Sequence, residues 1–216
     1  MAQIFHRSTN TIAKASIFGA GAIAAAVFAL GFAIQRSSYV TLVNVPRQQK
    51  VPFSHQHHVQ GVGLDCRYCH TSVEDSSFAG IPPTQTCMNC HSQLWTSASI
   101  LEPVRDSWKN GTALEWARVH DLADFVYFPH DVHVAKGVAC VTCHGRVDRM
   151  ALTWKSNSLY MEWCLECHRN PAKYLSPKEA VFRMDWEPPA DREALGRKLM
   201  EENKVHTRTD CSTCHR

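Results

Sequence analysis

All ten cysteines of this 216-residue chain fall into Cys-x-x-Cys pairs, and a histidine follows each pair. In chain order, the five motifs are Cys66-Arg67-Tyr68-Cys69-His70, Cys87-Met88-Asn89-Cys90-His91, Cys140-Val141-Thr142-Cys143-His144, Cys164-Leu165-Glu166-Cys167-His168 and Cys211-Ser212-Thr213-Cys214-His215. Two thiols at this spacing can bind the two vinyl groups of one porphyrin as thioethers. The next imidazole can then bind the iron. The sequence therefore predicts five haem c groups, each held by both cysteines of its motif, with the motif histidine as proximal ligand.

Two other uses of paired cysteines fit less well. A closed zinc site takes four ligands, usually from two pairs, and five pairs cannot be divided in that way. Zinc also does not require a histidine directly after each second cysteine. A redox dithiol would be a single pair near a βαβ pattern.

The histidines outside the motifs are grouped. Phe53-Ser54-His55-Gln56-His57-His58 precedes the first motif, and Phe128-Pro129-His130-Asp131-Val132-His133 precedes the third. Each group reads Phe-x-His-x-x-His and is followed by two motifs. This indicates an internal duplication of a dihaem unit, over residues 53–91 and 128–168, with a fifth haem site at 205–216.

Phe-x-His-x-x-His before a haem motif resembles the cytochrome c3 and c7 group. That resemblance implies that the first histidine of each group is the distal ligand of the haem directly downstream, so His55 lies opposite His70, and His130 opposite His144. It implies that His58 and His133 are distal ligands of other haems. The fifth distal ligand could be His120, Met161 or His206, with His57 a weaker candidate; we favour His120 or Met161.

The haem sites require support from short elements. Residues 37–216 offer few residues per porphyrin, so the haems must form most of the core. We predict a mainly α and loop fold, a multihaem cytochrome c (c3/c7-like) domain. Asn110-Gly111 indicates a turn, Ser176-Pro177-Lys178-Glu179 a helix start, and residues 191–203 an amphipathic helix. The haem-free stretch between His168 and Cys211 could cover haem or dock on a partner subunit.

Residues 15–35 contain no charged side chain and are long enough to span a bilayer. We expect residues 1–36 to form an N-terminal transmembrane signal anchor rather than a cleaved signal peptide, although Gly31-Phe32-Ala33 resembles a cleavage site. The flanking charges orient the span weakly. Covalent haem attachment outside the bacterial cytoplasmic membrane instead places the haem domain on the periplasmic side, and it places His6 on the cytoplasmic side. The net charge of +3 gives no indication of nucleic-acid binding.

Several segments together resemble one family over nearly the whole chain. They are CRYCHTSVE, GIPPTQTCMNCH, RVHDLADFVYF and MEWCLECHRNP, with the anchor and both repeats. They are similar to the pentahaem cytochrome c subunit of bacterial alternative complex III. The resemblance implies an electron-transfer subunit of a respiratory, quinol-oxidising membrane complex, with no catalytic residue of its own. Its implied partners are an iron–sulphur subunit, multi-span quinol-binding subunits, and a monohaem cytochrome c or terminal oxidase as acceptor.

Two other classes of multihaem protein share some of these features. A stand-alone NapC-type quinol dehydrogenase also has one anchor, but it has four haem motifs and lacks the repeated Phe-x-His-x-x-His. Pentahaem nitrite reductase is longer and marks its catalytic haem with lysine in place of the motif histidine, whereas all five motifs here end in histidine.

Overall fold

The computed structural model describes residues 4–215, and within this range the chain consists of helices and loops without a strand. Two isolated β-bridges, Val126 with His215 and Val138 with Leu175, join distant segments. The chain divides into two compact units, Met1–Val43 and Asn44–Arg216. The prediction of a mainly helical, loop-rich fold is confirmed.

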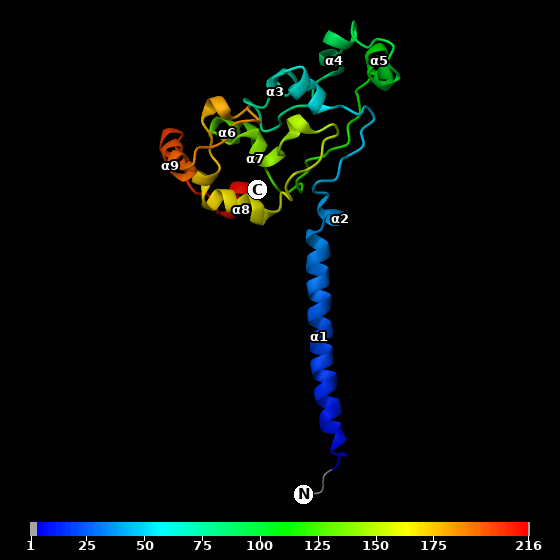
Figure 1. Cartoon of the computed structure of the whole chain (residues 1–216), viewed down its shortest axis with the longest axis vertical. Helices are drawn as coiled ribbons and strands as arrows, with labels where there is room; N and C mark the ends of the chain where they lie inside the picture. Colours follow the sequence, from blue (N-terminus) through cyan, green and yellow to red (C-terminus); the bar gives the residue numbers. More distant parts are fainter. Residues whose placement is uncertain (1–3, 216) are drawn as a thin grey trace. The chain divides into compact units, whose positions relative to one another are not determined.

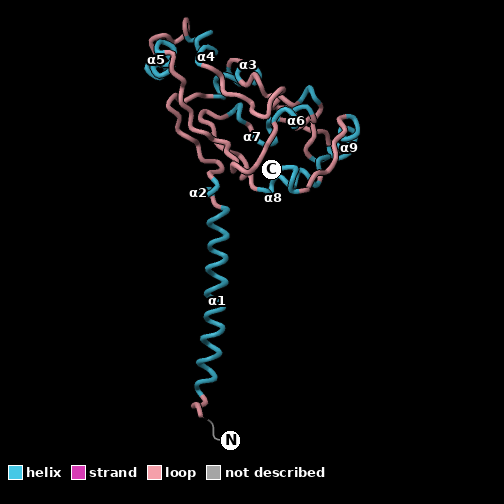
Figure 2. Tube along the Cα trace, turned by 180° about the vertical axis from the view of Figure 1, so that it is seen from behind, coloured by secondary structure: helices cyan, strands magenta, loops and turns pink. Residues whose placement is uncertain are grey.

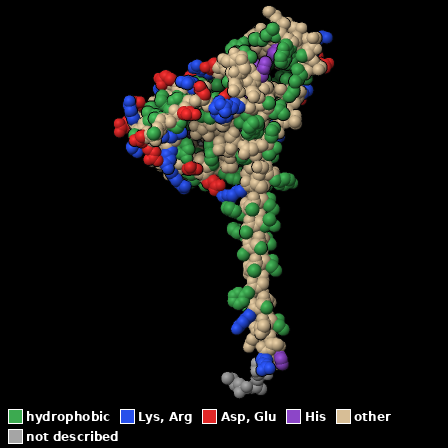
Figure 3. Space-filling model, viewed as in Figure 1, with side chains coloured by type: hydrophobic (Ala, Val, Ile, Leu, Met, Phe, Trp, Pro, Cys, Tyr) green, Lys and Arg blue, Asp and Glu red, His purple; other side chains and the backbone are tan. Residues whose placement is uncertain are grey.

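The first unit contains α1 (Ser8–Arg36) and the short α2 (Ser38–Thr41). None of the 29 residues of α1 is buried, and apolar side chains cover its length (Figure 3). An 18-residue window in α1 has a mean hydropathy of 2.3. At about 1.5 Å per residue, α1 exceeds the ~30 Å hydrocarbon core of a bilayer. It could therefore cross a membrane, although a signal sequence would meet the same criteria.

The second unit contains many short helical pieces (Figures 1 and 2). Before the second repeat these are η1 (Gln56–Gly61), α3 (Cys66–Cys69), α4 (Thr84–His91), η2 (Ser99–Leu101) and α5 (Glu102–Asn110). They continue with α6 (His130–Ala135), α7 (Cys140–His144), η3 (Val147–Arg149), α8 (Met161–Arg169), η4 (Pro171–Lys173), η5 (Lys178–Ala180), α9 (Arg192–Glu202) and α10 (Cys211–Cys214).

The segment that links the two repeats forms its own small packing unit. In α5, Pro103 occupies the first turn, where its missing N–H costs no hydrogen bond. The helix ends at the predicted turn, because Gly111 adopts the left-handed φ of 64°. Val104 and Ser107 face inward, and the Ser107 hydroxyl lies 2.7 Å from that of Thr84. This contact joins α5 to α4.

The stretch between the fourth and fifth motifs contains the predicted amphipathic helix as α9. The Asp191 carboxylate caps it by accepting a hydrogen bond from the Ala194 N–H at 2.9 Å. Gly196 lies against η4, where an added Cβ would overlap the Ala172 backbone. The predicted helix start at Ser176 is wrong in extent: only the 3₁₀ turn η5 forms, and Ser176 itself is buried.

The apolar core of the second unit is small. Its buried hydrophobic residues are Val51, Val73, Val104, Ala139, Met150, Ala172, Leu175, Ala180, Val181 and Leu199. Several are alanine or valine, which bury little area each. Many large apolar side chains, such as Trp95, Trp108 and Phe125, remain at least half exposed. Protein side chains alone therefore fill little of the interior.

Candidate haem sites

Each motif begins at or within a short helix, and the helix sets the geometry of its side chains. In the second, third and fourth motifs the histidine is part of the helix, and positions i, i+3 and i+4 lie on one face, so both thiols and the histidine point to the same side. In the first and fifth motifs the helix ends at the second cysteine, and the histidine directly follows it. In the first motif, Asp65 caps α3 by accepting a hydrogen bond from the Arg67 N–H at 2.8 Å. None of the ten thiols is in a disulfide. Five sets of two free thiols and one imidazole are thus presented.

The Nδ1 atom of every motif histidine has a hydrogen-bond partner. In chain order these are the carbonyls of Gly80 for His70 (2.7 Å) and Leu94 for His91 (3.1 Å), Nε2 of His120 for His144 (3.2 Å), and the carbonyls of Arg208 for His168 (3.0 Å) and Phe125 for His215 (3.1 Å). A carbonyl must accept, so Nδ1 carries the proton and Nε2 keeps its lone pair. An imidazole fixed in this way is arranged to bind a metal through Nε2.

The predicted distal histidines are held in the same way. Nδ1 of His58 donates to the Ser54 carbonyl at 2.8 Å, and Nδ1 of His133 to the Pro129 carbonyl at 2.7 Å. Nδ1 of His130 donates to the Ser77 carbonyl at 2.8 Å, and Nδ1 of His55 lies 3.0 Å from the Thr153 hydroxyl. Three of these partners are again carbonyls, which leave Nε2 free.

Four histidine pairs face one another at nearly constant separation. The ring centroids are 6.5 Å apart for His55 and His70, 6.2 Å for His58 and His91, 6.4 Å for His130 and His144, and 6.1 Å for His133 and His168. In the first pair of each repeat the two ring planes are nearly parallel, with interplanar angles of 9° and 16°. In the second pair they are steeply tilted, with interplanar angles of 71° and 65°. The duplication seen in the sequence is therefore also a duplication of geometry.

These separations fit a metal between the two rings. With a metal–imidazole bond of ~2.0 Å and ~1.1 Å from nitrogen to ring centre, two axial imidazoles have centroids ~6.2 Å apart. Rings in direct parallel stacking would lie closer. Each pair also has the two thiols of a motif beside one of its histidines. The donor set therefore fits a flat, covalently attached group with a six-coordinate metal, which describes haem c.

The phenylalanine of each repeat positions its two histidines. Phe53 stacks on His58 at 4.4 Å and meets His55 edge-on at 5.0 Å. Phe128 does the same to His133 at 4.3 Å and to His130 at 4.8 Å. One aromatic ring thus fixes both imidazoles of a repeat, a role that sequence reasoning did not assign to it.

The fifth motif has no such partner within residues 4–215: no ring contact joins His215 to a second histidine, and Phe125 lies 5.6 Å from it. Met161 stands at the start of α8 and is 64% exposed. His206, His57 and His6 are exposed. His57 lies 5.4 Å from Trp95, and Nδ1 of His6 lies 2.7 Å from the Ser8 hydroxyl.

His120 lies beside the third motif. Its Nε2 is 3.2 Å from Nδ1 of His144, and the two rings meet at 68° with centroids 4.3 Å apart. Burial, with a smaller contribution from Lys155, lowers the pKa of His120 to about 4. Burial lowers the pKa of His144 to about 3, and His120 adds to that shift. Both imidazoles are therefore neutral near pH 7.

The thiol pKa values show which motifs are neighbours. Burial raises the pKa of Cys140 to about 12, and the nearby Cys66 thiol raises it further. Burial also raises the pKa of Cys143 to about 12, and there the added contribution comes from the Cys167 thiol. The pKa of Cys69 is raised by burial and then by Cys87.

The same pattern extends to the end of the chain, since the pKa of Cys164 is raised by burial and then by Cys214. The motifs therefore adjoin in the order second, first, third, fourth, fifth. Figures 1 and 2 agree, with α3 beside α4, α7 between α3 and α8, and the C-terminal end beside α8. Nothing in the spacing of the motifs along the chain indicated this order.

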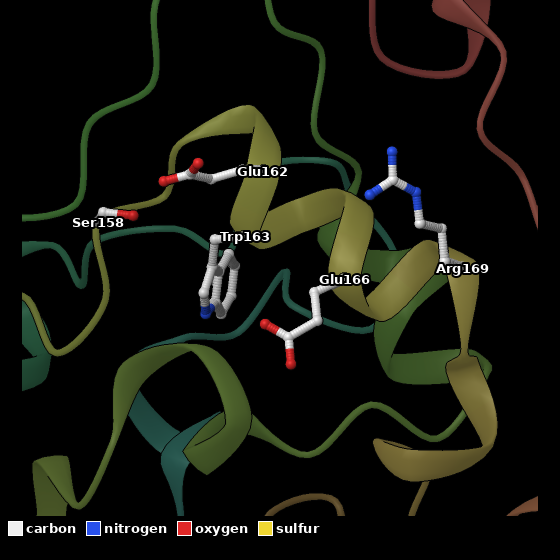
Figure 4. A pocket seen from close by; sticks show the side chains of 5 residues that line it. All are labelled: Ser158, Glu162, Trp163, Glu166 and Arg169. Atoms are coloured by element: carbon white, nitrogen blue, oxygen red, sulfur yellow. The ribbon is translucent and has the colours of Figure 1, made fainter.

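A cavity of about 540 Å³ adjoins the fourth motif and is lined by Ser158, Glu162, Trp163, Glu166 and Arg169. Trp163 and Glu166 project from one side of α8 and Arg169 from the other (Figure 4). The Tyr174 hydroxyl donates to Glu166 at 2.5 Å, and this bond raises the pKa of Tyr174 to about 12. The cavity thus combines an aromatic face with charged groups at its rim, directly beside Cys164 and Cys167.

Comparison with known proteins identifies a related family. Residues 126–216 match the family described as cytochrome c7 and related cytochrome c. This part of the chain contains the second repeat and the fifth motif. The chain is thus mainly helix and loop, with a c7-like multihaem cytochrome c domain matched over residues 126–216 and one apolar helix near its N-terminus.

A curated relative gives a closer comparison. The chain is 33% identical over 127 residues to the menaquinone reductase, multihaem cytochrome c subunit, of Nitratidesulfovibrio vulgaris. The aligned region covers 58% of this chain and 54% of the relative, so the chain spans about half the relative's length. The two proteins are homologous over the aligned region, and the relative is described as a multihaem cytochrome c subunit of a menaquinone reductase.

Proposed function

We propose that this chain is the electron-transfer subunit of a quinol-oxidising membrane complex of the alternative complex III type. It is held by α1 in the bacterial cytoplasmic membrane, with its five haem c groups on the periplasmic side. The observation that carries this proposal is the set of four histidine pairs with centroids 6.1 to 6.5 Å apart, each beside two free thiols.

The residues that hold the five haems follow from the motifs and the facing pairs. The ten motif cysteines bind covalently, and His70, His91, His144, His168 and His215 are the proximal ligands. The distal ligand of each of the first four sites is the histidine that faces its motif histidine. In chain order of the sites these are His55, His58, His130 and His133. Each ligand's Nδ1 contact holds the ring at the angle needed to bind through Nε2.

For the fifth site we propose Met161 rather than His120 as the distal ligand. Nε2 of His120 already lies against His144, whereas Met161 is exposed at the start of a helix whose Cys164 thiol interacts with Cys214 of the fifth motif. A His/Met site has a higher potential than a bis-His site, so it would suit the exit end. Met161→Leu is expected to abolish the spectral signature of a sulphur-ligated haem and to leave the other four sites unchanged.

The arrangement suits electron transfer rather than catalysis. Haem c, when bound, supplies one-electron transfer between ferrous and ferric iron. In four sites two facing histidines would hold the iron, which would leave no position on it for a substrate. Electrostatic interactions between thiols of different motifs link all five motifs in one series, which supports this assignment.

The single apolar helix is suited to anchoring and not to quinol chemistry. Oxidation of a quinol releases two protons with two electrons, and a site at bilayer depth needs groups that accept them. Residues 15–35 contain no ionisable side chain. We therefore assign the quinol site to partner subunits with several spans. An iron–sulphur subunit delivers the electrons, and a monohaem cytochrome c or terminal oxidase receives them.

A second direction of electron flow is favoured by the relative, whose name describes a menaquinone reductase. In that case the chain would deliver electrons toward quinone rather than receive them. The two directions, and the stand-alone NapC-type alternative, are separated by experiment.

The test starts with the complex purified from native membranes. We expect the chain's intact mass to exceed that of the polypeptide by five haems, and we expect co-purifying iron–sulphur and multi-span subunits. Addition of a menaquinol analogue should reduce the haems of the complex rapidly. Four or fewer haems would contradict the proposed sites, and reduction of quinone by pre-reduced haems without the reverse reaction would favour the reductase.

The control uses the chain isolated with all its haems. The same menaquinol analogue should reduce it slowly and without sensitivity to a quinol-site inhibitor. Rapid, inhibitor-sensitive reduction of the isolated chain would show a quinol site in this chain itself and would favour the NapC-type alternative.

A further inference from the structure

The third motif differs from the other four in what holds its proximal histidine. His70, His91, His168 and His215 each donate from Nδ1 to a backbone carbonyl. His144 instead faces the side chain of His120, with 3.2 Å between Nδ1 of His144 and Nε2 of His120. This is the one motif whose ligand is oriented by another imidazole.

The protonation pattern of this pair follows from ligand chemistry. If Nε2 of His144 binds iron, its proton must be on Nδ1, because a neutral imidazole has one proton. Nδ1 of His144 is then the donor, and Nε2 of His120 must accept. The proton of His120 is consequently on its own Nδ1, and its Nε2 lone pair is occupied by the hydrogen bond.

His120 lies where the two repeats meet. The His120 ring interacts electrostatically with the rings of both His55 and His130. His55 belongs to the first site and His130 to the third. The acceptor for His144 is thus at the junction of two neighbouring sites, in the middle of the series of motifs.

We infer that His120 is a positioning residue for the third site: by accepting the Nδ1 hydrogen bond of His144, it fixes that ring and sets the electron-donating strength of the ligand. This inference rests on the proposed function, since it requires a haem at the third motif. An acceptor on Nδ1 makes the imidazole a more basic ligand, and hydrogen bonding of this kind is one of the ways in which a protein tunes a haem potential. A more basic ligand favours ferric iron, so the bond lowers the potential of this haem.

The experiment compares His120→Leu, which removes the acceptor, with His120→Gln, whose amide oxygen can reach a similar position and accept as the carbonyls do elsewhere. His57→Leu is the matched control, because His57 is an exposed histidine without a bond to a motif histidine. Each variant is made in the full chain, its haem content is measured by mass, and its haems are titrated spectroelectrochemically.

We expect all variants to keep five low-spin haems. In His120→Leu, the midpoint potential of one haem should rise. At a fixed applied potential, the ratio of reduced to oxidised haem at that site should then increase on the order of fivefold, as expected for the loss of one hydrogen bond. The other four midpoints stay in place, and both His120→Gln and His57→Leu titrate as the wild type.

Unchanged midpoint potentials in His120→Leu would overturn the inference. A new high-spin haem that binds carbon monoxide would also overturn it, because it would show that His120 is an iron ligand. Fewer than five haems in the wild-type chain would instead contradict the proposed function. If His120→Leu does not load haem, nitrogen NMR of ¹⁵N-histidine-labelled, fully reduced wild type decides. A His120 ring protonated at Nδ1 with an unprotonated, metal-free Nε2 supports the inference, and a ring protonated or metal-bound at Nε2 overturns it.

Discussion

At the scale of single residues, the spacing between opposed imidazoles is the most informative quantity. The rings of His58 and His91 are 6.2 Å apart, and the neighbouring His57 points elsewhere, toward Trp95. Two adjacent histidines in one turn of helix therefore face different partners. The difference arises because the Ser54 carbonyl and the Phe53 ring hold His58 and not His57.

This contrast gives a direct prediction. His58→Leu should leave the second haem covalently attached but without its distal ligand. One fifth of the haem should then become high-spin and bind carbon monoxide when reduced, as measured by absorbance and electron paramagnetic resonance. His57→Leu is the control and should remain fully low-spin. Carbon monoxide binding in the control rather than in His58→Leu would reverse the two assignments.

A second residue-scale feature supports the first repeat from outside the haem sites. The Asp148 carboxylate is 8% exposed and accepts two hydrogen bonds from Arg146, at 2.8 and 2.6 Å. These bonds hold the pKa of Asp148 below its usual range. Asp148 lies within η3 and Arg146 directly precedes it. The residue after η3, Met150, accepts a hydrogen bond through its carbonyl from the Gln56 N–H at 3.1 Å. It thereby braces the helix that contains His58.

We predict that Asp148→Asn lowers the free energy of unfolding by about 2 kcal/mol at pH 7, the contribution expected of charged hydrogen bonds. The folded pKa is lowered, so the stabilisation is fully present above the unfolded value of ~3.9 and is lost as pH falls through the folded pKa. The difference between wild type and variant, measured by denaturant titration, should therefore shrink below about pH 4.

The control is Asp121→Asn, because Asp121 pairs with Arg118 at a comparable 2.9 Å but on the surface, with side chains 61% and 70% exposed. An exposed pair contributes little, so this variant should unfold like the wild type. Equal loss in both variants would show that burial of Asp148 is not the reason for its effect.

At the scale of elements, most helices are too short to be stable alone. They are stabilised by contacts with other elements. The clearest case is α9 against η4, where Gly196 allows the helix to approach the Ala172 carbonyl. Leu199 and Ala172 are buried in this contact. A glycine in the middle of a helix lowers the stability of that helix. Here the close packing of α9 against η4 offsets that loss.

We predict that Gly196→Ala destabilises the chain by about 1–3 kcal/mol despite alanine's better helix propensity, because the added methyl group has no room. Gly61→Ala is the control, since its Cβ would meet the nearest atom at an ordinary 3.7 Å. Thermal unfolding followed by haem absorbance measures both. A Gly196→Ala variant as stable as the wild type would show that α9 can move away from η4 without cost.

At the scale of the whole molecule, the chain consists of an apolar helix and a domain with few buried side chains. The first unit has no buried residue between Ser8 and Arg36, and the second has a core of ten small or medium apolar residues. The small core of the second unit leaves room for haem between its side chains. The first unit could be covered by lipid if it stays in the mature chain.

We predict that the mature chain keeps α1. Its intact mass, measured after extraction from membranes, should include the residues up to Arg36, and washing membranes at alkaline pH should not release it. Replacement of residues 1–36 by a cleavable export signal should give a haem-loaded soluble domain. A native chain that begins just after Ala33 would show that the segment is a signal peptide instead.

The sequence alone predicted the chemistry of the sites. Two thiols three positions apart, with a histidine directly after the second, indicate haem attachment through local spacing, which needs no distant contact. The duplicated Phe-x-His-x-x-His groups likewise indicated four candidate ligands, and continuous hydropathy indicated the apolar helix. These features are local, so they can be read from residue spacing.

Tertiary structure decided which residues meet. The order of the motifs depends on interactions between residues far apart in the chain, such as that of the Cys66 thiol with the Cys140 thiol. The same is true of His120, for which spacing allowed an iron ligand but folding places Nε2 against His144, 24 residues away. The helix start at Ser176 yielded only one turn, because packing buried that serine. Pairings between distant segments depend on the packing of the whole chain, and residue spacing does not encode them.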